Sequence, residues 1–211
     1  GGAASVMAEG AAVSSPAEVG NTASDTQLSR EEITAKVKSR IEMPEDYTEF
    51  TMDYSTGSDG STIYHLSWEP VENINHSDIS VSADAEGRIL SYYRYTRYDD
   101  SSEAMVSDSR DSVIAQMTET IQTMLPECFT EGDTYTLDAS TFNMDGSGTA
   151  AYIRYKDGIK VWGNEINIRF VKNDGKYILT ELDSSHDYDA QFGENTDGEN
   201  IAERYRELAA G

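Results

Sequence analysis

Two stretches of the chain carry apolar residues at helical spacing, and each is followed by stretches in which apolar and polar residues alternate. The first helical stretch places three apolar residues on one face: Ile33, Val37 and Ile41. Ser29 followed by Glu32 is the signature of a capping box, with Leu28 and Ile33 placed as a hydrophobic staple. Pro44 predicts the end of the helix, because the residue before a proline is pushed out of the α region.

A second helical stretch, eighty residues later in the chain, follows a similar plan. It begins after Ser109 and ends before Pro126. Its inward positions are Val113, Met117, Ile121 and either Met124 or Leu125.

Four strand-like stretches follow each helix. In the first half we expect them at about 47–54, 61–69, 77–84 and 88–97, and in the second half at about 133–142, 149–156, 160–171 and 176–184. A spacing of two puts matching apolar triplets on one face of a strand in each half: Ile79, Val81 and Ala83, and Ile166, Ile168 and Phe170.

Glycine-containing dipeptides between these stretches predict tight hairpins. Asp59-Gly60 and Asp145-Gly146 divide the first two strands of each half, and Glu86-Gly87 and Asp174-Gly175 divide the last two. Asp-Gly is a strong hairpin signal, because both residues of a type I′ turn need positive φ.

The repeated order predicts an α+β fold built from two tandem repeats. In each repeat, one N-terminal helix packs on a roughly four-stranded antiparallel sheet. We divide the chain into a disordered leader or tether (1–27), a first repeat (28–100), a second repeat (101–190) and a C-terminal helical tail (191–211).

The charge of the chain excludes some partners. A net charge of −23 repels nucleic acid and anionic membrane surfaces. No apolar stretch has the length of a transmembrane helix, so we expect membrane contact only through an upstream anchor. Thirteen Tyr against five Phe indicate half-buried sheet surfaces, where a ring packs and its hydroxyl stays hydrated.

The sequence contains no established catalytic, nucleotide-binding or metal-binding motif. His65, His76 and His186 are scattered, and the pair His186-Asp187 does not suggest a triad, whose members come from separate elements. The single cysteine, Cys128, follows a helix end and is interpreted as a small buried hydrophobe. We therefore predict no enzyme, with no catalytic, cofactor-binding or metal-ligating residues and no cofactor.

The most unusual segment is the run of Tyr and Arg from Tyr92 to Tyr98. Alternation puts Tyr93, Tyr95 and Arg97 on one face of a strand. Because Tyr and Arg are enriched in binding hot spots, these three are the candidate partner contact. The alternative is an ordinary sheet face, where aromatic pairs stabilise neighbouring strands. A weaker counterpart in the second half consists of Tyr152, Tyr155 and Trp162.

The second half also contains a sequence pattern that resembles a known family. The pattern is the segment Arg154–Ile168, with its Asp157-Gly158 turn and Trp162-Gly163, followed by Asn173-Asp174-Gly175-Lys176 and a closing strand. It resembles the PepSY-like repeat of the YcdB/YcdC type, which in turn resembles the propeptide modules of secreted metallopeptidases. The first half shows a weaker copy at Ala83–Ile89, and Trp68-Glu69-Pro70 replaces its first turn. The resemblance covers about residues 29–189.

The resemblance implies a cystatin- or PepSY-like fold and an exported bacterial protein, cell-surface anchored or secreted, without catalytic residues. The glycines at the turn positions of the family pattern are interpreted as having a structural role and no binding role: Gly87, Gly158, Gly163 and Gly175. We expect an extracytoplasmic binding module that restrains a secreted or envelope peptidase, or docks another envelope protein, through strand-edge contacts at residues 88–98. The alternatives are a small-ligand sensor, with Tyr-rich strands lining a concave face, and an envelope structural protein.

Overall fold

The computed structural model describes residues 27–95 and 108–193. The order of elements is helix, four strands, helix, short 3₁₀ helix, four strands, which confirms an α+β fold. The elements are α2 (Arg30–Lys38), β3 (Glu49–Thr56), β4 (Thr62–Glu69), β5 (Asp78–Asp84), β6 (Ile89–Tyr95), α3 (Arg110–Met124), η2 (Pro126–Phe129), β7 (Asp133–Phe142), β8 (Ser147–Lys156), β9 (Ile159–Asn173) and β10 (Lys176–Ser184). The expected leader and helical tail lie outside the described residues, except for residue 27 and residues 191–193.

Both helices begin where the sequence predicts. At α2 the Ser29 hydroxyl accepts from the Glu32 backbone N–H at 3.1 Å, and the Ser29 N–H donates to the Glu32 carboxylate at 2.9 Å. This reciprocal pair satisfies two N–H groups that a helix start otherwise leaves without partners. The side chain of Ser109 caps α3 by accepting from Ser112 N–H, which is one of the two bonds seen at α2. Pro126 ends α3 and opens η2, where its missing N–H is not needed.

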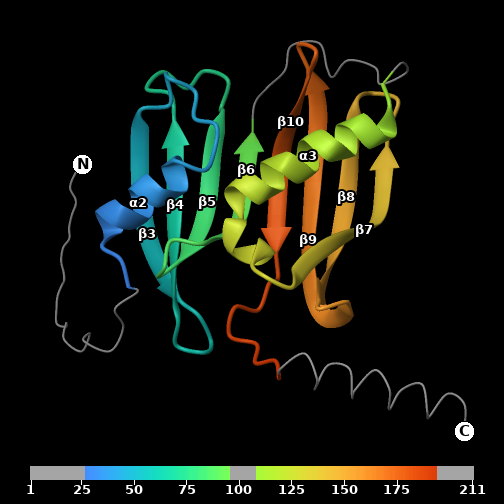
Figure 1. Ribbon diagram of the computed structural model, residues 1–211. Coiled ribbons are helices and arrows are strands. Elements are labelled where there is room, and N and C mark those ends of the chain that lie inside the picture. Colours follow the sequence, from blue (N-terminus) through green and yellow to red (C-terminus); the bar gives the residue numbers. More distant parts are fainter. Residues whose placement is uncertain (1–26, 96–107, 194–211) are drawn as a thin grey trace, which may run out of the picture.

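The eight strands form one continuous antiparallel sheet, in the order β3-β4-β5-β6-β10-β9-β8-β7 (Figure 1). This corrects the expectation of two repeats that each carry their own four-stranded sheet. The last strands of the two halves, β6 and β10, pair with Tyr92 opposite Leu182. Their pairing converts two open strand edges into sheet interior and leaves only β3 and β7 at the outer edges.

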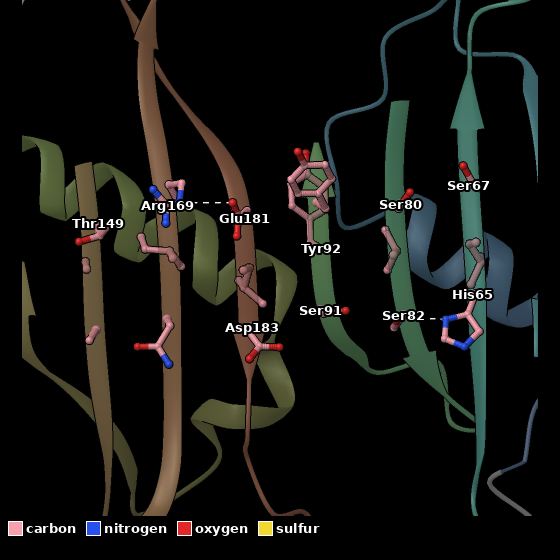
Figure 2. A pocket seen from close by; sticks show the side chains of 18 of the residues that line it. His65, Ser67, Ser80, Ser82, Ser91, Tyr92, Thr149, Arg169, Glu181 and Asp183 are labelled. Atoms are coloured by element: carbon pink, nitrogen blue, oxygen red, sulfur yellow. Dashed lines mark hydrogen bonds and ion pairs between the residues drawn. The ribbon is translucent and has the colours of Figure 1, made fainter. Parts of the chain in front are cut away.

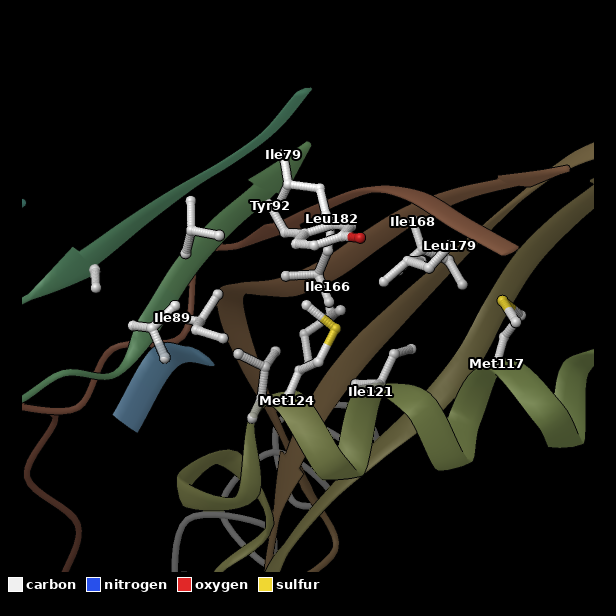
Figure 3. Close-up of a cluster of buried hydrophobic side chains, with 14 of the residues drawn as sticks. Ile79, Ile89, Tyr92, Met117, Ile121, Met124, Ile166, Ile168, Leu179 and Leu182 are labelled. Carbon is white, nitrogen blue, oxygen red and sulfur yellow. The ribbon is translucent and has the colours of Figure 1, made fainter. Parts of the chain in front are cut away.

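Both helices lie on the same face of the sheet, so the two halves share a single core (Figures 1 and 3). Helix α2 buries Ile33 and Val37, and α3 buries Val113, Met117, Ile121 and Met124. The two apolar triplets predicted from the alternation are all buried beneath them: Ile79, Val81, Ala83, Ile166, Ile168 and Phe170. Tyr92 and Leu182 carry this core across the junction between β6 and β10. Each fully buried Ile, Leu or Phe contributes roughly 1.5–3 kcal/mol.

The hairpin turns divide into two kinds. At Asp174-Gly175 both residues have positive φ (54° and 75°), as a two-residue type I′ turn requires, and Asp157-Gly158 behaves in the same way. At Asp59-Gly60 and Asp145-Gly146 only the glycine has positive φ, so the type I′ expectation was wrong there. The physical reason is local: the Asp59 carboxylate accepts from the backbone N–H and hydroxyl of Ser61, which closes a wider turn.

One strand glycine has a packing role. A Cβ at Gly148 would lie 2.5 Å from the Phe170 ring and 2.6 Å from the Thr141 carbonyl oxygen. Gly148 pairs directly with Phe170 across β8 and β9, so the ring lies over the space that a side chain would occupy.

Candidate functional site

The face of the sheet opposite the helices is open, and the register of the strands aligns its side chains into two rows that cross all eight strands. The Asp53 row consists, from β3 to β7, of Asp53, His65, Ser82, Ser91, Asp183, Asn167, Ala151 and Ala139. The Thr51 row beside it consists of Thr51, Ser67, Ser80, Tyr93, Glu181, Arg169, Thr149 and Thr141.

Together the two rows line a groove of about 650 Å³ that is open to solvent (Figure 2). Nine of the sixteen side chains in the two rows are Ser, Thr or Ala, and these short side chains leave room above the backbone. Ser is not among the residues that favour strands, yet Ser80, Ser82 and Ser91 occupy the middle of the sheet. Where a local preference is broken without a packing gain, a functional reason is expected. The open face is therefore the candidate binding surface.

The candidate contact residues of the Tyr-Arg run lie partly on this surface. Tyr93 and Tyr95 are on the open face, 44% and 40% exposed, whereas Tyr92 is buried in the core. Arg97 lies outside the described residues. Strand β6 pairs with β5 on one side and β10 on the other, so the expected strand addition at residues 88–98 is wrong. A partner can therefore contact the side chains of Tyr93 and Tyr95, but it cannot pair with the backbone of β6.

A second polar cluster is buried under the helix-covered side of β8. The Arg154 side chain is only 5% exposed, and its Nε donates to Asp133 Oδ1 at 2.8 Å. Its Nη1 donates to Asn164 Oδ1 at 2.9 Å and to the Asp187 carbonyl at 3.1 Å. The Asp187 N–H donates to the same Asn164 oxygen at 2.7 Å. This network anchors the segment after β10 to the sheet.

The Asp133 carboxyl is held ionised by this cluster. Burial alone would raise the pKa of Asp133, but hydrogen bonds from Arg154 and Thr130 and the nearby positive charges outweigh burial and lower the pKa. Because the Arg154 and Asp133 charges compensate each other, we interpret this ion pair as a structural feature and not as a ligand-binding site.

Two residues of types that often act in catalysis, the half-buried His186 and the buried Cys128, lie near this cluster. His186 Nδ1 lies 2.7 Å from the Tyr135 hydroxyl, and burial, together with the positive charge of Arg154, lowers the pKa of His186 to about 4. Cys128 is fully buried, its Sγ lies 3.3 Å from the Tyr188 hydroxyl, and burial raises the pKa of the thiol to about 11. A neutral imidazole and a protonated thiol in these positions fit a packing role. His65, in contrast, is exposed on β4 between Ser55 and Ser82.

The described residues contain no group of three or more His, Cys, Asp or Glu side chains placed to share a metal ion. Across residues 27–95 and 108–193, no helix has both the length and the apolar character needed to cross a membrane.

Sequence reasoning missed both the groove and the buried cluster. The Ser80 and Ser82 side chains alternate with the buried triplet on β5, so their common face could have been read from the spacing. The Asp53 row and the Thr51 row could not be predicted from the spacing, because they depend on which strands are neighbours in the sheet. The pairing of Arg154 with Asp133 likewise follows from the β7–β8 register, which places Arg154 opposite Tyr135, two residues from Asp133.

The fold is similar to a solved structure, the Bacillus megaterium YpeB C-terminal domain. The TM-score is 0.53 at 10% sequence identity, over 79% of this chain and 70% of that chain. At this identity the likeness concerns the fold alone. No curated protein matches the sequence.

Residues 30–180 match the family described as the YcdB, YcdC repeated domain. The matched range spans more than half of the chain and includes both helices and nearly all of the sheet. The resemblance to PepSY-like repeats of the YcdB/YcdC type is thereby confirmed. The chain belongs to the family of the YcdB, YcdC repeated domain.

Proposed function

We propose that this protein is a non-catalytic binding module that recognises a protein partner through the groove on the open face of its sheet. The observation that carries the proposal is the pair of registered rows, rich in Ser and Thr and contributed by all eight strands, that line one groove. The PepSY-like family and fold, a module type without catalysis, are consistent with it. The hydrogen-bonded states of the half-buried His186 and the buried Cys128 also support a binding rather than a catalytic role.

The shape and lining of the groove favour a macromolecular partner over a small ligand. Small-molecule sites are mostly apolar and enclose most of the ligand surface. This groove is open to solvent, presents Ser and Thr hydroxyls beside apolar surface, and is lined by residues of all eight strands, from β3 to β7. A polypeptide segment can use such a long surface, whereas a small-ligand sensor would need an enclosed site.

The partner class that we propose is a secreted or envelope peptidase, restrained by the module outside the cytoplasm of a bacterium. This part rests on the kinship with PepSY-like repeats and their resemblance to metallopeptidase propeptides. The mechanism differs from the strand addition first expected, because β6 has no free edge. Tyr93, which stands in the Thr51 row, would contribute its ring and hydroxyl to the contact.

The test uses one variant that fills the groove and one matched control. Ser91→Trp places a large side chain in the centre of the Asp53 row, at a strand position where aromatic residues are well tolerated. Ser58→Trp places the same side chain on the exposed β3–β4 turn, outside the groove. Each immobilised protein is exposed to extracellular and envelope proteins of the host, and the activity of any captured peptidase is assayed with and without the module.

A peptidase that the wild type and Ser58→Trp both capture and inhibit, and that Ser91→Trp does not, would support the proposal. Capture that is unaffected by Ser91→Trp would refute the groove as the binding surface. Capture without any change in peptidase activity would retain the binding module but reject the restraint of a peptidase.

A further inference from the structure

The charges of the groove are unbalanced. The two rows contain the acids Asp53, Glu181 and Asp183 and a single permanently charged base, Arg169. Arg169 Nε lies 3.3 Å from the Glu181 carboxylate and balances that charge. Among the described residues, no Lys, Arg or His nitrogen comes within 4.0 Å of the carboxylates of Asp53 or Asp183. These two acids, in a chain of net charge −23, make the groove attractive to a cationic occupant.

The remaining lining of the groove suits a polypeptide backbone. Ser67 and Ser91 each present a hydroxyl, which can donate and accept a hydrogen bond. The Ser80 hydroxyl donates to Asp78 Oδ2 at 3.0 Å and the Ser82 hydroxyl is hydrogen-bonded to His65 Nδ1 at 3.2 Å, so each offers an occupant only its remaining hydrogen-bonding capacity. An extended segment has free N–H and C=O groups to pair with them, whereas a helix uses those groups internally. The hydroxyl rows therefore fit an extended chain better than a docked helix.

The spacing of the two unbalanced acids sets the spacing of their partners. Asp53 on β3 and Asp183 on β10 stand in the same row, separated by the strands β4, β5 and β6. Four inter-strand steps of about 4.8 Å amount to roughly 19 Å. An extended chain covers this distance in about six residues at roughly 3.3 Å each. Six is an even number, so both side chains would project from the same face of the segment.

We propose that the groove binds an extended cationic polypeptide segment, in which two basic side chains six residues apart contact Asp53 and Asp183 while the backbone lies on the Ser and Thr hydroxyls. This inference rests on the proposed function and specifies the chemistry of the partner segment. Contact between the carboxylates and the basic side chains supplies charge-assisted hydrogen bonds at two fixed points.

The probe is a fluorescently labelled, end-capped heptapeptide with lysine at its first and seventh positions and neutral polar residues between them. A control peptide has the same composition, with its two lysines adjacent. Binding is followed by fluorescence anisotropy for the wild type, Asp53→Asn, Asp183→Asn and the double variant. Glu119→Gln, which removes an exposed carboxylate from α3 on the other side of the sheet, controls for net charge.

We expect the spaced peptide to bind more tightly than the adjacent-lysine peptide, with an affinity that falls as salt is added. Each Asp→Asn substitution should weaken binding about 1.5- to 5-fold, the range of an exposed ion pair. The two effects should multiply in the double variant, since the sites are far apart. Glu119→Gln should leave the affinity unchanged.

The inference is overturned if the spaced peptide does not bind, if both peptides bind equally, or if Asp53→Asn and Asp183→Asn act no more strongly than Glu119→Gln. Groove-dependent binding of a neutral oligosaccharide such as cellohexaose in place of the peptide would also overturn it. These failures are distinct from failure of the proposed function. That function stands as long as Ser91→Trp abolishes capture of the protein partner, and falls if it does not.

Discussion

Replacement of Arg154 by Met should destabilise the protein far more than replacement of an exposed arginine, because it leaves a buried carboxylate without its main partner. The Asp133 side chain is 3% exposed and would keep only the Thr130 hydroxyl at 2.8 Å and the Lys156 ammonium at 3.8 Å. Three hydrogen bonds from Arg154 would be lost, to Asp133, Asn164 and Asp187. Breaking a buried ion pair in this way costs about 3–5 kcal/mol.

Urea unfolding at pH 7, followed by tryptophan fluorescence, measures the loss. The matched control is Arg169→Met, since the Arg169–Glu181 pair is 59% and 48% exposed and should contribute at most about 1 kcal/mol. The double variant Asp133→Leu/Arg154→Met leaves neither charge buried, so it should recover about 2 kcal/mol or more of the loss predicted for Arg154→Met alone.

The same variant should respond to pH in a defined direction. In the wild type the pKa of Asp133 is lowered, so its contribution to stability is present above the unfolded-state pKa and is lost as pH falls through the folded-state value. In Arg154→Met, burial dominates and raises the pKa of Asp133, so protonation removes the penalty. The destabilisation of the variant relative to the wild type should therefore shrink as the pH is lowered from 7 towards 4.

Two results would refute this reasoning. One is a loss for Arg154→Met no larger than that for Arg169→Met. The other concerns the double variant Asp133→Leu/Arg154→Met. If its loss of stability equals the sum of the losses for Asp133→Leu and Arg154→Met measured separately, the two residues are not energetically coupled.

Three further predictions concern stability and are checked by the same urea titrations. Gly148→Ala should cost about 1–3 kcal/mol, because its methyl group must displace the buried Phe170 ring, and an unchanged midpoint would contradict the close approach. Ser29→Ala removes the cap of α2 and should cost about 0.5–2 kcal/mol, with no loss if the capping box does not form in solution. Glu127→Gln breaks the bidentate pair with Arg40, at 2.9 and 2.7 Å, that ties the turn after α2 to η2, and a loss of about 1–2 kcal/mol is expected. A change within measurement error would mean that the pair does not hold the halves together.

The buried cluster and the groove differ in how much of each was visible in the sequence. The alternation in β5 reveals that Ile79 and Val81 share one face and that Ser80 and Ser82 share the other. Nothing local shows that the serines continue, strand by strand, into Asp183 on β10, more than a hundred residues later in the chain. The Arg154 cluster is even less visible, since it joins β7, β8, β9 and the segment after β10.

The sequence by itself determined the local elements of this protein: the two capped helices, the position of nearly every strand, the buried face of each, and the two-residue turn at Asp174-Gly175. These features depend on neighbours within a few residues, through caps, turn conformations and side-chain periodicity. Only the tertiary structure decided that β6 pairs with β10, so that two expected sheets become one and the Tyr-rich strand loses its free edge. The physical reason is that a period of two fixes which face of a strand is buried, but not which strand lies beside it. The groove exists only because that pairing brings eight strands into register.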